Sequence, residues 1–274
     1  MSNITAISAG KPSALEFFAG IGLARLGLER AGFRVAWSND YEPSKREMYD
    51  AHFRDDVRRT GHTFRLGDIG KLTGADLPTG ASLAWASSPC TDLSLAGSRA
   101  GLGGSESSTF WEFVRILDEL GDARPKVAVL ENVVGLATSH GGDDIAAAIR
   151  AFNQLGYSVD VLALDARRFV PQSRPRLFLV GAMERPADTR EPNSELRPDW
   201  LQAVYGDPNL RTHRAPLPTP PIPVTSGLGN LVEDIASSDG RWWDSARTKA
   251  FLDSLSPTQR ERMTQLRRGS GVKY

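Results

Sequence analysis

Short apolar runs alternate with amphipathic stretches along most of the chain before Glu184, and this alternation restricts the fold more than any other feature. Each apolar run has the length of a buried strand, and a stretch of helical period separates most runs from the next. Strands that are joined through helices pair in parallel, so the pattern predicts a parallel sheet covered by helices on both faces. We expect strands at residues 14–18, 34–38, 63–66, 82–86, 127–130, 157–164 and 176–181.

Helices are expected between these strands, at residues 23–31, 43–52, near 108–120 and at 143–155. Gly32 and Gly156 stand where the first and the last of them should stop, because glycine readily adopts the left-handed conformation of a helix C-terminus. No helical pattern separates the last two strands, which can therefore form an antiparallel pair. The chain is thus predicted to be an α/β protein with a doubly wound, mostly parallel, seven-stranded Rossmann-like sheet and an antiparallel edge hairpin.

The composition changes near Glu184. Seven of the 17 prolines precede this residue and ten follow it, and the later part of the chain is weakly patterned. We therefore divide the chain into a domain at residues 13–183 and a partial second domain or linker at residues 184–274. In the second part helices are expected at residues 248–255 and 257–267. Residues 258–273 are locally basic, which most often indicates a solvated helix face.

Charge and cysteine content exclude several classes of protein. The 33 Lys and Arg residues balance 33 Asp and Glu residues, so the chain is neither a polybasic tail nor an acidic solvating segment. A single cysteine rules out an intramolecular disulfide and a cysteine-cluster zinc site, and we expect no bound metal. No apolar run approaches the length of a membrane span, so we expect a cytoplasmic protein without membrane contact.

The carboxyl ends of the predicted strands carry the residues of chemical interest, and ligands bind at that edge of an open parallel sheet. After the first strand, Phe18-Ala19-Gly20-Ile21-Gly22 lets the backbone approach a ligand closely, although a purely structural turn explains two glycines equally well. Arg25 stands where the dinucleotide fingerprint G-x-G-x-x-G has its third glycine, which disfavours a pyrophosphate-containing cofactor. A nucleoside cofactor without phosphates, such as S-adenosylmethionine, fits better.

Acidic residues also end the next two predicted strands. Asp40 can accept hydrogen bonds from ribose hydroxyls, and Tyr41 beside it could stack on an adenine. Asp68 lies near the expected position of a purine amino group. These residue types suit a nucleoside site at the edge of the sheet.

Three further features suggest catalysis. A lone cysteine is usually a small buried residue, but Cys90 follows Pro89 on a loop that leaves a strand, which suits a nucleophile. Glu131 comes directly after an apolar run and would not point unpaired into a core, although it could also cap a helix. The segment Gln172-Ser173-Arg174-Pro175-Arg176 carries two guanidinium groups, which alone most often indicate a solvated edge or a phosphate contact.

In their order along the chain, these segments resemble the cytosine-C5 DNA methyltransferases. The resemblance covers about residues 15–181 and rests on Phe18-Ala19-Gly20-Ile21-Gly22, Asn39-Asp40-Tyr41, Gly67-Asp68-Ile69, Pro89-Cys90, Glu131-Asn132-Val133 and Gln172-Ser173-Arg174-Pro175-Arg176. It implies the methyltransferase form of the Rossmann-like sheet and S-adenosylmethionine as the cofactor. The cofactor site that it implies consists of Phe18, Gly20, Gly22, Asp40, Tyr41, Asp68, Ile69 and Pro89.

The resemblance also implies a mechanism for the methylation of cytosine in double-stranded DNA. In the family a cysteine thiolate, here Cys90, adds to carbon 6 of the ring and thereby activates carbon 5. Glu131, supported by Asn132, would hold N3 and the exocyclic amine, and Arg174, with Arg176 beside it, would hold O2. A stacked base is out of reach, so the cytosine must be flipped out, and residues 96–107 resemble the family's mobile catalytic loop.

The match does not extend to the later segments of the family. We find no convincing counterpart of its conserved helical segment or of the C-terminal stretch that completes the cofactor pocket. We therefore expect weak or no activity from this chain alone. A truncated gene product, an engineered fragment and one half of a split enzyme, whose complementing chain would supply the absent segments, all stay open as explanations. Two alternatives stay open: the tRNA-methylating branch of the family, and a non-catalytic module that binds cofactor or DNA for a partner subunit.

Overall fold

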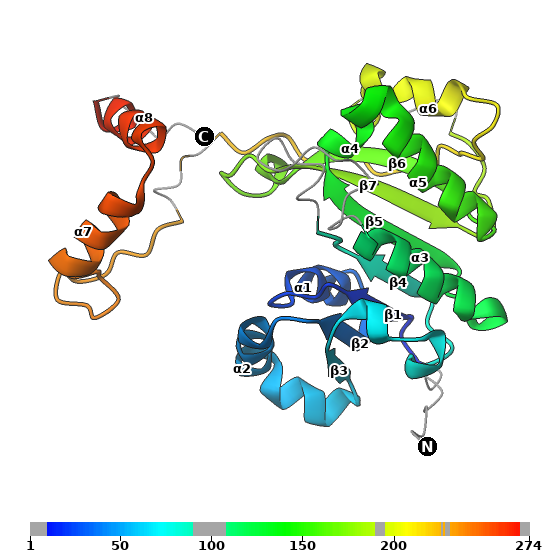
Figure 1. Cartoon of the computed structure of the whole chain (residues 1–274), viewed down its shortest axis with the longest axis horizontal. Coiled ribbons are helices and arrows are strands. Elements are labelled where there is room, and N and C mark those ends of the chain that lie inside the picture. Colours follow the sequence, from blue (N-terminus) through cyan, green and yellow to red (C-terminus); the bar gives the residue numbers. More distant parts are fainter. Residues whose placement is uncertain (1–9, 90–107, 190–194, 226, 228–230, 269–274) are drawn as a thin grey trace. The chain divides into compact units, whose positions relative to one another are not determined.

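The computed structural model describes residues 10–89, 108–189, 195–225, 227 and 231–268 (Figure 1). Contacts within the chain divide it into two compact units. The first unit comprises Met1–Leu164 and Pro175–Pro220, and the second comprises Asp165–Arg174 and Pro221–Tyr274. Among the described residues, no helix is both long and apolar enough to cross a membrane.

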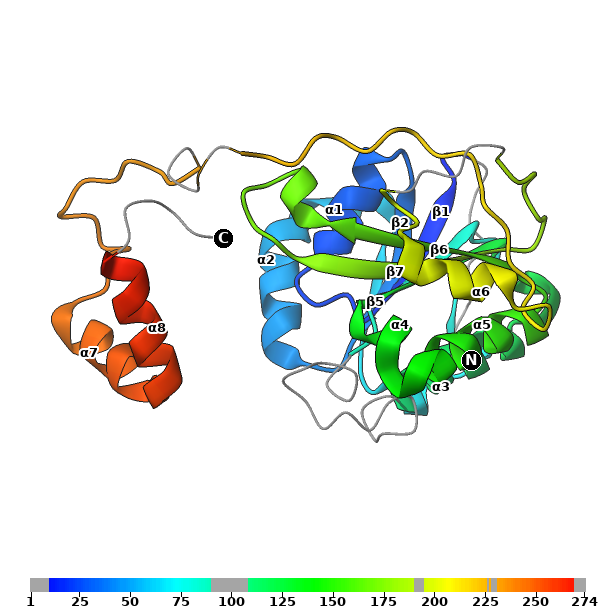
Figure 2. The same cartoon turned by 90° about the horizontal axis from the view of Figure 1, so that it is seen from above.

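A seven-stranded sheet with the order β3-β2-β1-β4-β5-β7-β6 forms the centre of the first unit (Figures 1 and 2). Strands β1 to β5 pair in parallel, and β7 runs antiparallel to β5. The predicted α/β sheet with an antiparallel edge is therefore confirmed. The strands are β1 (Ser13–Phe17), β2 (Arg34–Asp40), β3 (Thr63–Leu66), β4 (Leu83–Ala86), β5 (Val127–Val133), β6 (Ser158–Asp165) and β7 (Pro175–Ala182).

The predicted helices are also present, with one difference in length. The helix predicted at residues 43–52 continues to Thr60, where Gly61 ends it in the left-handed conformation with φ 67°. The sequence beyond Phe53 is polar and shows no apolar stripe, so periodicity alone could not place this end. The α-helices are α1 (Leu23–Arg30), α2 (Pro43–Thr60), α3 (Ser108–Glu119), α4 (Gly135–Thr138), α5 (Asp143–Gln154), α6 (Gln202–Gly206), α7 (Ser245–Ser254) and α8 (Pro257–Arg268).

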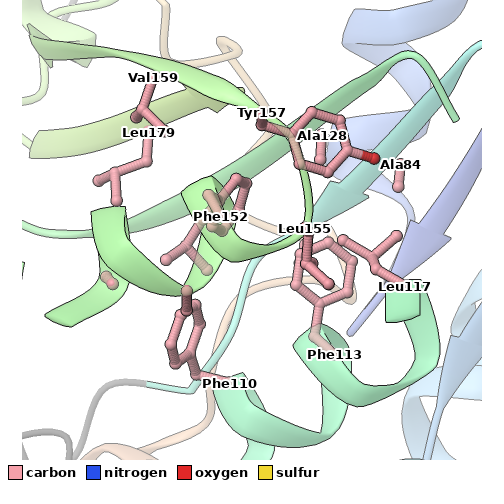
Figure 3. Packing of buried hydrophobic residues seen from close by; sticks show 14 of the residues in the cluster. Ala84, Phe110, Phe113, Leu117, Ala128, Phe152, Leu155, Tyr157, Val159 and Leu179 are labelled. Atoms are coloured by element: carbon pink, nitrogen blue, oxygen red, sulfur yellow. The ribbon is translucent and has the colours of Figure 1, made fainter. Parts of the chain in front are cut away.

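Alternate residues of β1 face opposite sides of the sheet, and each side has its own helices. Leu15 and Phe17 join the large apolar cluster that includes α3 and α5, whereas Ala14 packs with Leu28 of α1. Phe110 and Phe113 of α3 lie beside Phe152 of α5 in this large cluster (Figure 3), where the rings of Phe113 and Phe152 are 6.4 Å apart. Helices on both faces make the sheet doubly wound, as predicted.

Residues beyond Glu184 complete the core of the first unit. Arg197 is buried and forms an ion pair with Asp160 of β6, with 2.5 Å between Nη2 and Oδ2. The hydroxyl of Tyr205 in α6 donates a hydrogen bond to the other carboxylate oxygen of Asp160 (2.7 Å), and Leu201 and Val204 join the core. Single polar pairings hold this segment in place, so no periodic pattern in the sequence could reveal it.

A buried polar network fastens β1 to β2, α1 and α2. The carboxylate of Glu16 has no exposed surface and accepts hydrogen bonds from the Arg25 amide (2.9 Å) and the Ser38 hydroxyl (2.8 Å). The Ser38 oxygen lies 3.0 Å from the Tyr49 hydroxyl and 3.0 Å from His62 Nε2. Arg25 is equally buried, and its Nη1 donates to the Tyr49 hydroxyl (3.1 Å). The network therefore connects the start of α1 with the end of β2.

Burial sets the charge states within this network. It raises the pKa of Glu16 to about 7, although the hydrogen bonds from Ser38 and Arg25 act in the opposite direction. It lowers the pKa of His62 to about 3, assisted by the positive charges of Arg25 and Arg46. Glu16 therefore titrates near neutral pH, whereas the imidazole of His62 stays neutral there.

The second unit contains the β6–β7 connection and the last two helices. The Val224 amide donates to the Arg167 carbonyl (2.8 Å), and Arg168 Nη1 donates to the Pro221 carbonyl (2.8 Å). No described side chain of α7 or α8 is fully buried, and Trp243 before α7 is 47% exposed. Both helices thus leave apolar side chains partly open to solvent.

Replacing Glu16 by Gln should change how stability depends on pH. The folded-state pKa of Glu16 lies above its ordinary value of 4.5, so ionisation of Glu16 costs stability as the pH rises through about 7. The Glu16→Gln variant lacks this loss, and its free energy of unfolding should gain about 3 kcal/mol on the wild type between pH of about 4.5 and about 8. Urea unfolding across this range measures the difference.

The control is Glu29→Gln, because Glu29 is 32% exposed and forms an ion pair with Arg25, whose amide donates to Glu16. This variant should keep most of the pH dependence of the wild type, because the charge of Glu29 is the smallest of the effects on the pKa of Glu16. Equal pH dependence in the wild type and in Glu16→Gln would contradict the assignment of a near-neutral pKa to Glu16.

Removing Asp160 should destabilise the first unit strongly. Asp160→Ala leaves the buried Arg197 guanidinium without its counter-charge, which costs about 3–5 kcal/mol in comparable buried pairs. Asp160→Asn keeps an acceptor for Tyr205 and should lose less. Urea unfolding measures both variants, with Glu184→Gln, which breaks only an exposed pair with Lys126, as the control. A loss no larger for Asp160→Ala than for this control would refute the structural role of the pair.

Candidate active site

Five parallel strands bring the predicted site residues to one edge of the sheet. Strands β1 to β5 run in the same direction, so the residues at their carboxyl ends share this edge. Phe18 follows β1, Asp40 is the last residue of β2, and Glu131 lies two residues before the end of β5. The parallel pairing therefore gathers residues that are far apart in sequence, as expected from the positions of the strands.

The turn after β1 contains two glycines with different roles. Gly20 has φ 56°, and nothing lies within 4 Å of the position where a Cβ would be, so its surface is open to a ligand. Gly22 has φ 87°, and a Cβ there would come within 2.4 Å of the Phe53 ring and 2.9 Å of the Tyr49 ring. Gly22 is therefore required by packing against α2, whereas Gly20 has open space beside its Cα. Phe18 also has a positive φ, of 58°.

Asp40 is the acidic residue that lies against this turn. Its side chain is only 4% exposed, and its Oδ2 accepts a hydrogen bond from the Gly20 amide (2.8 Å). Its Oδ1 accepts another from the Glu42 amide (3.0 Å), and Lys45 Nζ lies 3.9 Å away. A carboxylate oxygen can accept more than one hydrogen bond, so these contacts orient Asp40 and still leave capacity for a hydroxyl group.

The other predicted cofactor residues lie in different settings. Tyr41 is 63% exposed, and Lys45 lies 5.8 Å from the centre of its ring. Asp68 caps the short 3-10 helix Ile69–Lys71 by accepting from the Gly70 amide (2.9 Å). Ile69 is buried in the core. The structure thus leaves the Tyr41 ring available for stacking and gives Asp68 a structural task as well.

Cys90 and the loop at residues 96–107 lie outside the described residues. The residues just before Cys90 are described: Ser88 is buried, and its hydroxyl oxygen lies 3.1 Å from that of Thr109 in α3. Pro89 follows as a half-buried residue. The chain therefore enters the Cys90 segment from the carboxyl end of β4, as the sequence predicts.

Glu131 and Arg176 form an ion pair across the β5–β7 boundary. The distance between Glu131 Oε1 and Arg176 Nε is 3.0 Å, and the two side chains are only 22% and 19% exposed. Arg176 stands opposite Val133 in the antiparallel register, which brings it diagonally next to Glu131. Asn132 follows Glu131 in β5, so its side chain faces the opposite side of the sheet, where it is buried and its oxygen accepts from the Val133 amide (2.8 Å). The structure thus brings two of the five predicted catalytic residues, Glu131 and Arg176, into direct contact.

Arg174 belongs to the second unit, whereas Glu131 and Arg176 belong to the first. Its side chain is exposed, and its backbone amide donates to Asp165 Oδ1 (2.7 Å). The sequence favoured Arg174 over Arg176 as the partner of the reacting ring. In the structure, Arg176 is the arginine that contacts Glu131.

Sequence reasoning missed several residues that shape the site. A signal existed for Glu16, because a carboxylate inside an apolar strand needs a buried partner. In the sequence, Arg25 stands out only as a departure from a glycine motif. In the structure, its backbone amide donates a hydrogen bond to Glu16. Asp165 gave no signal, since its contacts depend on how the β6–β7 connection folds.

Curated methyltransferases are similar to this chain. It is 31% identical over 186 residues to the Type II methyltransferase M.NgoBI of Neisseria gonorrhoeae, covering 67% of this chain and 55% of that protein. It is 34% identical over 176 residues to the Type II methyltransferase M.BanI of Aneurinibacillus aneurinilyticus, covering 62% and 38%. The orphan methyltransferase M.SPRI of Bacillus phage SPR is 28% identical over 252 residues, covering 90% and 50%. The chain thus spans about half the length of the curated relatives that it matches.

Solved structures share the fold at lower identity. The Entamoeba histolytica methyltransferase EhMeth superposes with a TM-score of 0.53 and 17% identity, covering 67% of this chain and 56% of that one. The S. pombe Dnmt2 methyltransferase has a TM-score of 0.50 and 21% identity, covering 65% and 53%. These matches confirm the methyltransferase form of the Rossmann-like sheet.

A family model describes the greater part of the chain. The model for the C-5 cytosine-specific DNA methylases matches residues 13–254, from the start of β1 to the end of α7. The family resemblance expected from the short motifs is thereby confirmed. The chain belongs to the C-5 cytosine-specific DNA methylase family.

Proposed function

We propose that this chain transfers a methyl group from S-adenosylmethionine to carbon 5 of a flipped-out cytosine in double-stranded DNA. The observation that carries the proposal is the pairing of Glu131 with Arg176 at the carboxyl edge of the sheet, at 3.0 Å. One carboxylate and one guanidinium on neighbouring strands match the hydrogen-bonding edge of cytosine. Membership of the cytosine-C5 family supports the same reaction.

The residues after β1 and β2 fit S-adenosylmethionine. Gly20 leaves open space beside its Cα, and the Asp40 carboxylate next to it can accept hydrogen bonds from ribose hydroxyls. The exposed ring of Tyr41 offers a face for an adenine, and Asp68, Ile69, Phe18 and Pro89 complete the proposed site. When bound, S-adenosylmethionine supplies an electrophilic methyl group.

The proposed chemistry assigns each catalytic residue one task. The thiolate of Cys90 forms a bond to carbon 6, and the ring becomes an enamine that is nucleophilic at carbon 5. Glu131, supported by Asn132, accepts a hydrogen bond from the exocyclic amine and, in its protonated form, gives its proton to N3, which neutralises the charge that the thiolate brings into the ring. Once carbon 5 carries the methyl group, a water molecule takes the proton from carbon 5, the electron pair of that C–H bond re-forms the double bond between carbons 5 and 6, and the Cys90 thiolate leaves.

Both arginines of the segment Gln172–Arg176 belong to the proposal, with different tasks. Arg176 contacts Glu131 directly, so we assign to it the orientation of that carboxylate and the contact with O2 of the ring. Arg174 is exposed and acts as a second guanidinium toward the substrate. A positively charged pair near the base would also favour the thiolate form of Cys90.

The partners in this proposal are DNA and a complementing chain. The chain spans about half the length of the curated relatives that it matches. We propose that full activity needs the remaining segments of the family as well, whether they belong to the same polypeptide or to a complementing chain. We place the activity in the cytoplasm, and the Type II names of the relatives suggest a role in restriction and modification.

Covalent trapping on DNA that contains 5-fluorocytosine tests the reaction. Fluorine at carbon 5 cannot leave as a cation, so an enzyme that attacks carbon 6 stays attached after methyl transfer. With S-adenosylmethionine, and with any adjacent gene product added, the wild type should form a denaturation-resistant adduct, whereas Cys90→Ala should form none. Glu131→Gln should slow trapping by about 100-fold or more.

Two outcomes of this experiment would change the proposal. An adduct in no combination of chains would favour a non-catalytic module that binds cofactor or DNA. Rapid methylation with repeated turnover by this chain alone would remove the need for a complementing chain.

Calorimetric binding of S-adenosylmethionine tests the cofactor site. Asp40→Ala removes the proposed ribose acceptor and the support of the Gly20 amide, so the affinity should fall by about 10- to 100-fold. Asp40→Asn keeps one acceptor and should lose less. Asp50→Asn, which affects only an ion pair with Arg46 in α2, is the matched control. Equal affinities for Asp40→Ala and the control would rule out this site.

A further inference from the structure

The Asp165 carboxylate joins the two ends of the connection between β6 and β7, beside one long backbone hydrogen bond from the Ala166 amide to the Arg174 carbonyl (3.3 Å). Asp165 Oδ1 accepts hydrogen bonds from the Arg167 amide (3.0 Å) and from the Arg174 amide (2.7 Å). Its Oδ2 accepts from the Ser173 hydroxyl (2.9 Å). The Asp165 side chain therefore binds groups at both ends of the connection: the Arg167 amide at its start, and the Ser173 hydroxyl and the Arg174 amide at its end.

We propose that Asp165 is a positioning residue that fixes the backbone of Arg174, so that its guanidinium is held ready for the substrate. This inference rests on the proposed function, because the substrate contact of Arg174 is part of it. Asp165 touches neither substrate nor cofactor in this scheme and acts only through the segment it binds.

Local helix capping alone does not account for these contacts. Capping of the 3-10 helix Ala166–Arg168 needs only the bond from the Arg167 amide. The bonds from Ser173 and Arg174 come from the other end of the connection, eight and nine residues further on. Two of the three bonds therefore serve the segment that carries Arg174.

The Asp165 carboxylate is ionised at neutral pH. Partial burial would raise the pKa of Asp165, but the hydrogen bonds from Arg167, Arg174 and Ser173 outweigh it and leave the pKa below its ordinary value. Hydrogen bonds to a charged acceptor are stronger than those between neutral groups. The closure therefore persists at neutral pH and offers no pH switch there.

Fixing the backbone matters because the Arg174 side chain is exposed and long. A free arginine loses rotamer entropy when it binds, and a mobile backbone would add to that cost. Arg176 needs no such support, because it lies within β7 and contacts Glu131. Different contacts thus hold the two arginines: Asp165 binds the backbone amide of Arg174, whereas Arg176 is held by its place in β7 and by its ion pair with Glu131.

The rate of trapping on 5-fluorocytosine DNA, measured together with DNA affinity, tests the positioning role. Asp165→Ala should slow adduct formation by about 10-fold or more and change DNA affinity by less than about 3-fold, because orientation rather than attraction is lost. Asp165→Asn keeps one acceptor oxygen and should recover part of the rate. Ser173→Ala removes one bond to the same carboxylate and is the matched control, with a smaller effect.

A double-mutant cycle separates this role from simple destabilisation. If Asp165 acts through Arg174, then Asp165→Ala should have little further effect on the rate in an Arg174→Ala background. Full additivity of the two losses would overturn the proposal. Hydrogen–deuterium exchange of residues 165–174 provides a second readout: uptake should rise in Asp165→Ala while the melting temperature of the protein changes little.

The outcomes distinguish this proposal from the proposed function. A wild type that forms no adduct in any combination of chains would refute the proposed function and, with it, the task assigned to Arg174. An active wild type with unchanged trapping and unchanged exchange in Asp165→Ala would refute the positioning role alone.

Discussion

The hydrogen bonds of the buried Glu16 carboxylate are the interactions on which the turn after β1 and the end of β2 depend. The carboxylate lies in the central part of the sheet, where no water can solvate it, and so it must be satisfied by protein groups. The partners it takes are the first turn of α1, through the Arg25 amide, and β2, through Ser38. Two residues beyond Ser38, Asp40 holds the Gly20 amide. The open glycine and its carboxylate are therefore set in place by a polar contact deeper in the fold.

The same network explains why an arginine can replace a glycine in the first helix. Arg25 is buried beneath α2, with its guanidinium 4.1 Å from the centre of the Phe53 ring and hydrogen-bonded to Tyr49. Tyr49 and Phe53 also crowd Gly22, where no side chain would fit. The bulk of Arg25 and the absence of a side chain at Gly22 are thus two parts of one packing arrangement. Gly20, in contrast, contacts nothing on its open side and remains available for function.

Sequence patterns predicted the sheet, and which residues share its carboxyl edge, because both depend on period and on strand direction. Apolar runs separated by helices imply parallel strands, and Asp40, Glu131 and the glycine turn then fall on one edge without any knowledge of side-chain contacts. The buried pair of Asp160 and Arg197 could not be predicted, since it joins single residues 37 positions apart. The contact between Arg176 and Glu131 was also out of reach, because it depends on the register of β7 against β5.

That register follows from the direction of β7. Since β7 is antiparallel to β5, its first residues lie beside the last residues of β5, and Arg176 stands opposite Val133. A parallel strand in the same position would carry its first residues to the other edge of the sheet, away from Glu131. Because β7 is reversed, Arg176 near its start lies beside Glu131 near the end of β5. The antiparallel edge is thus what allows a sheet of otherwise parallel strands to place a guanidinium against the carboxylate at its functional edge.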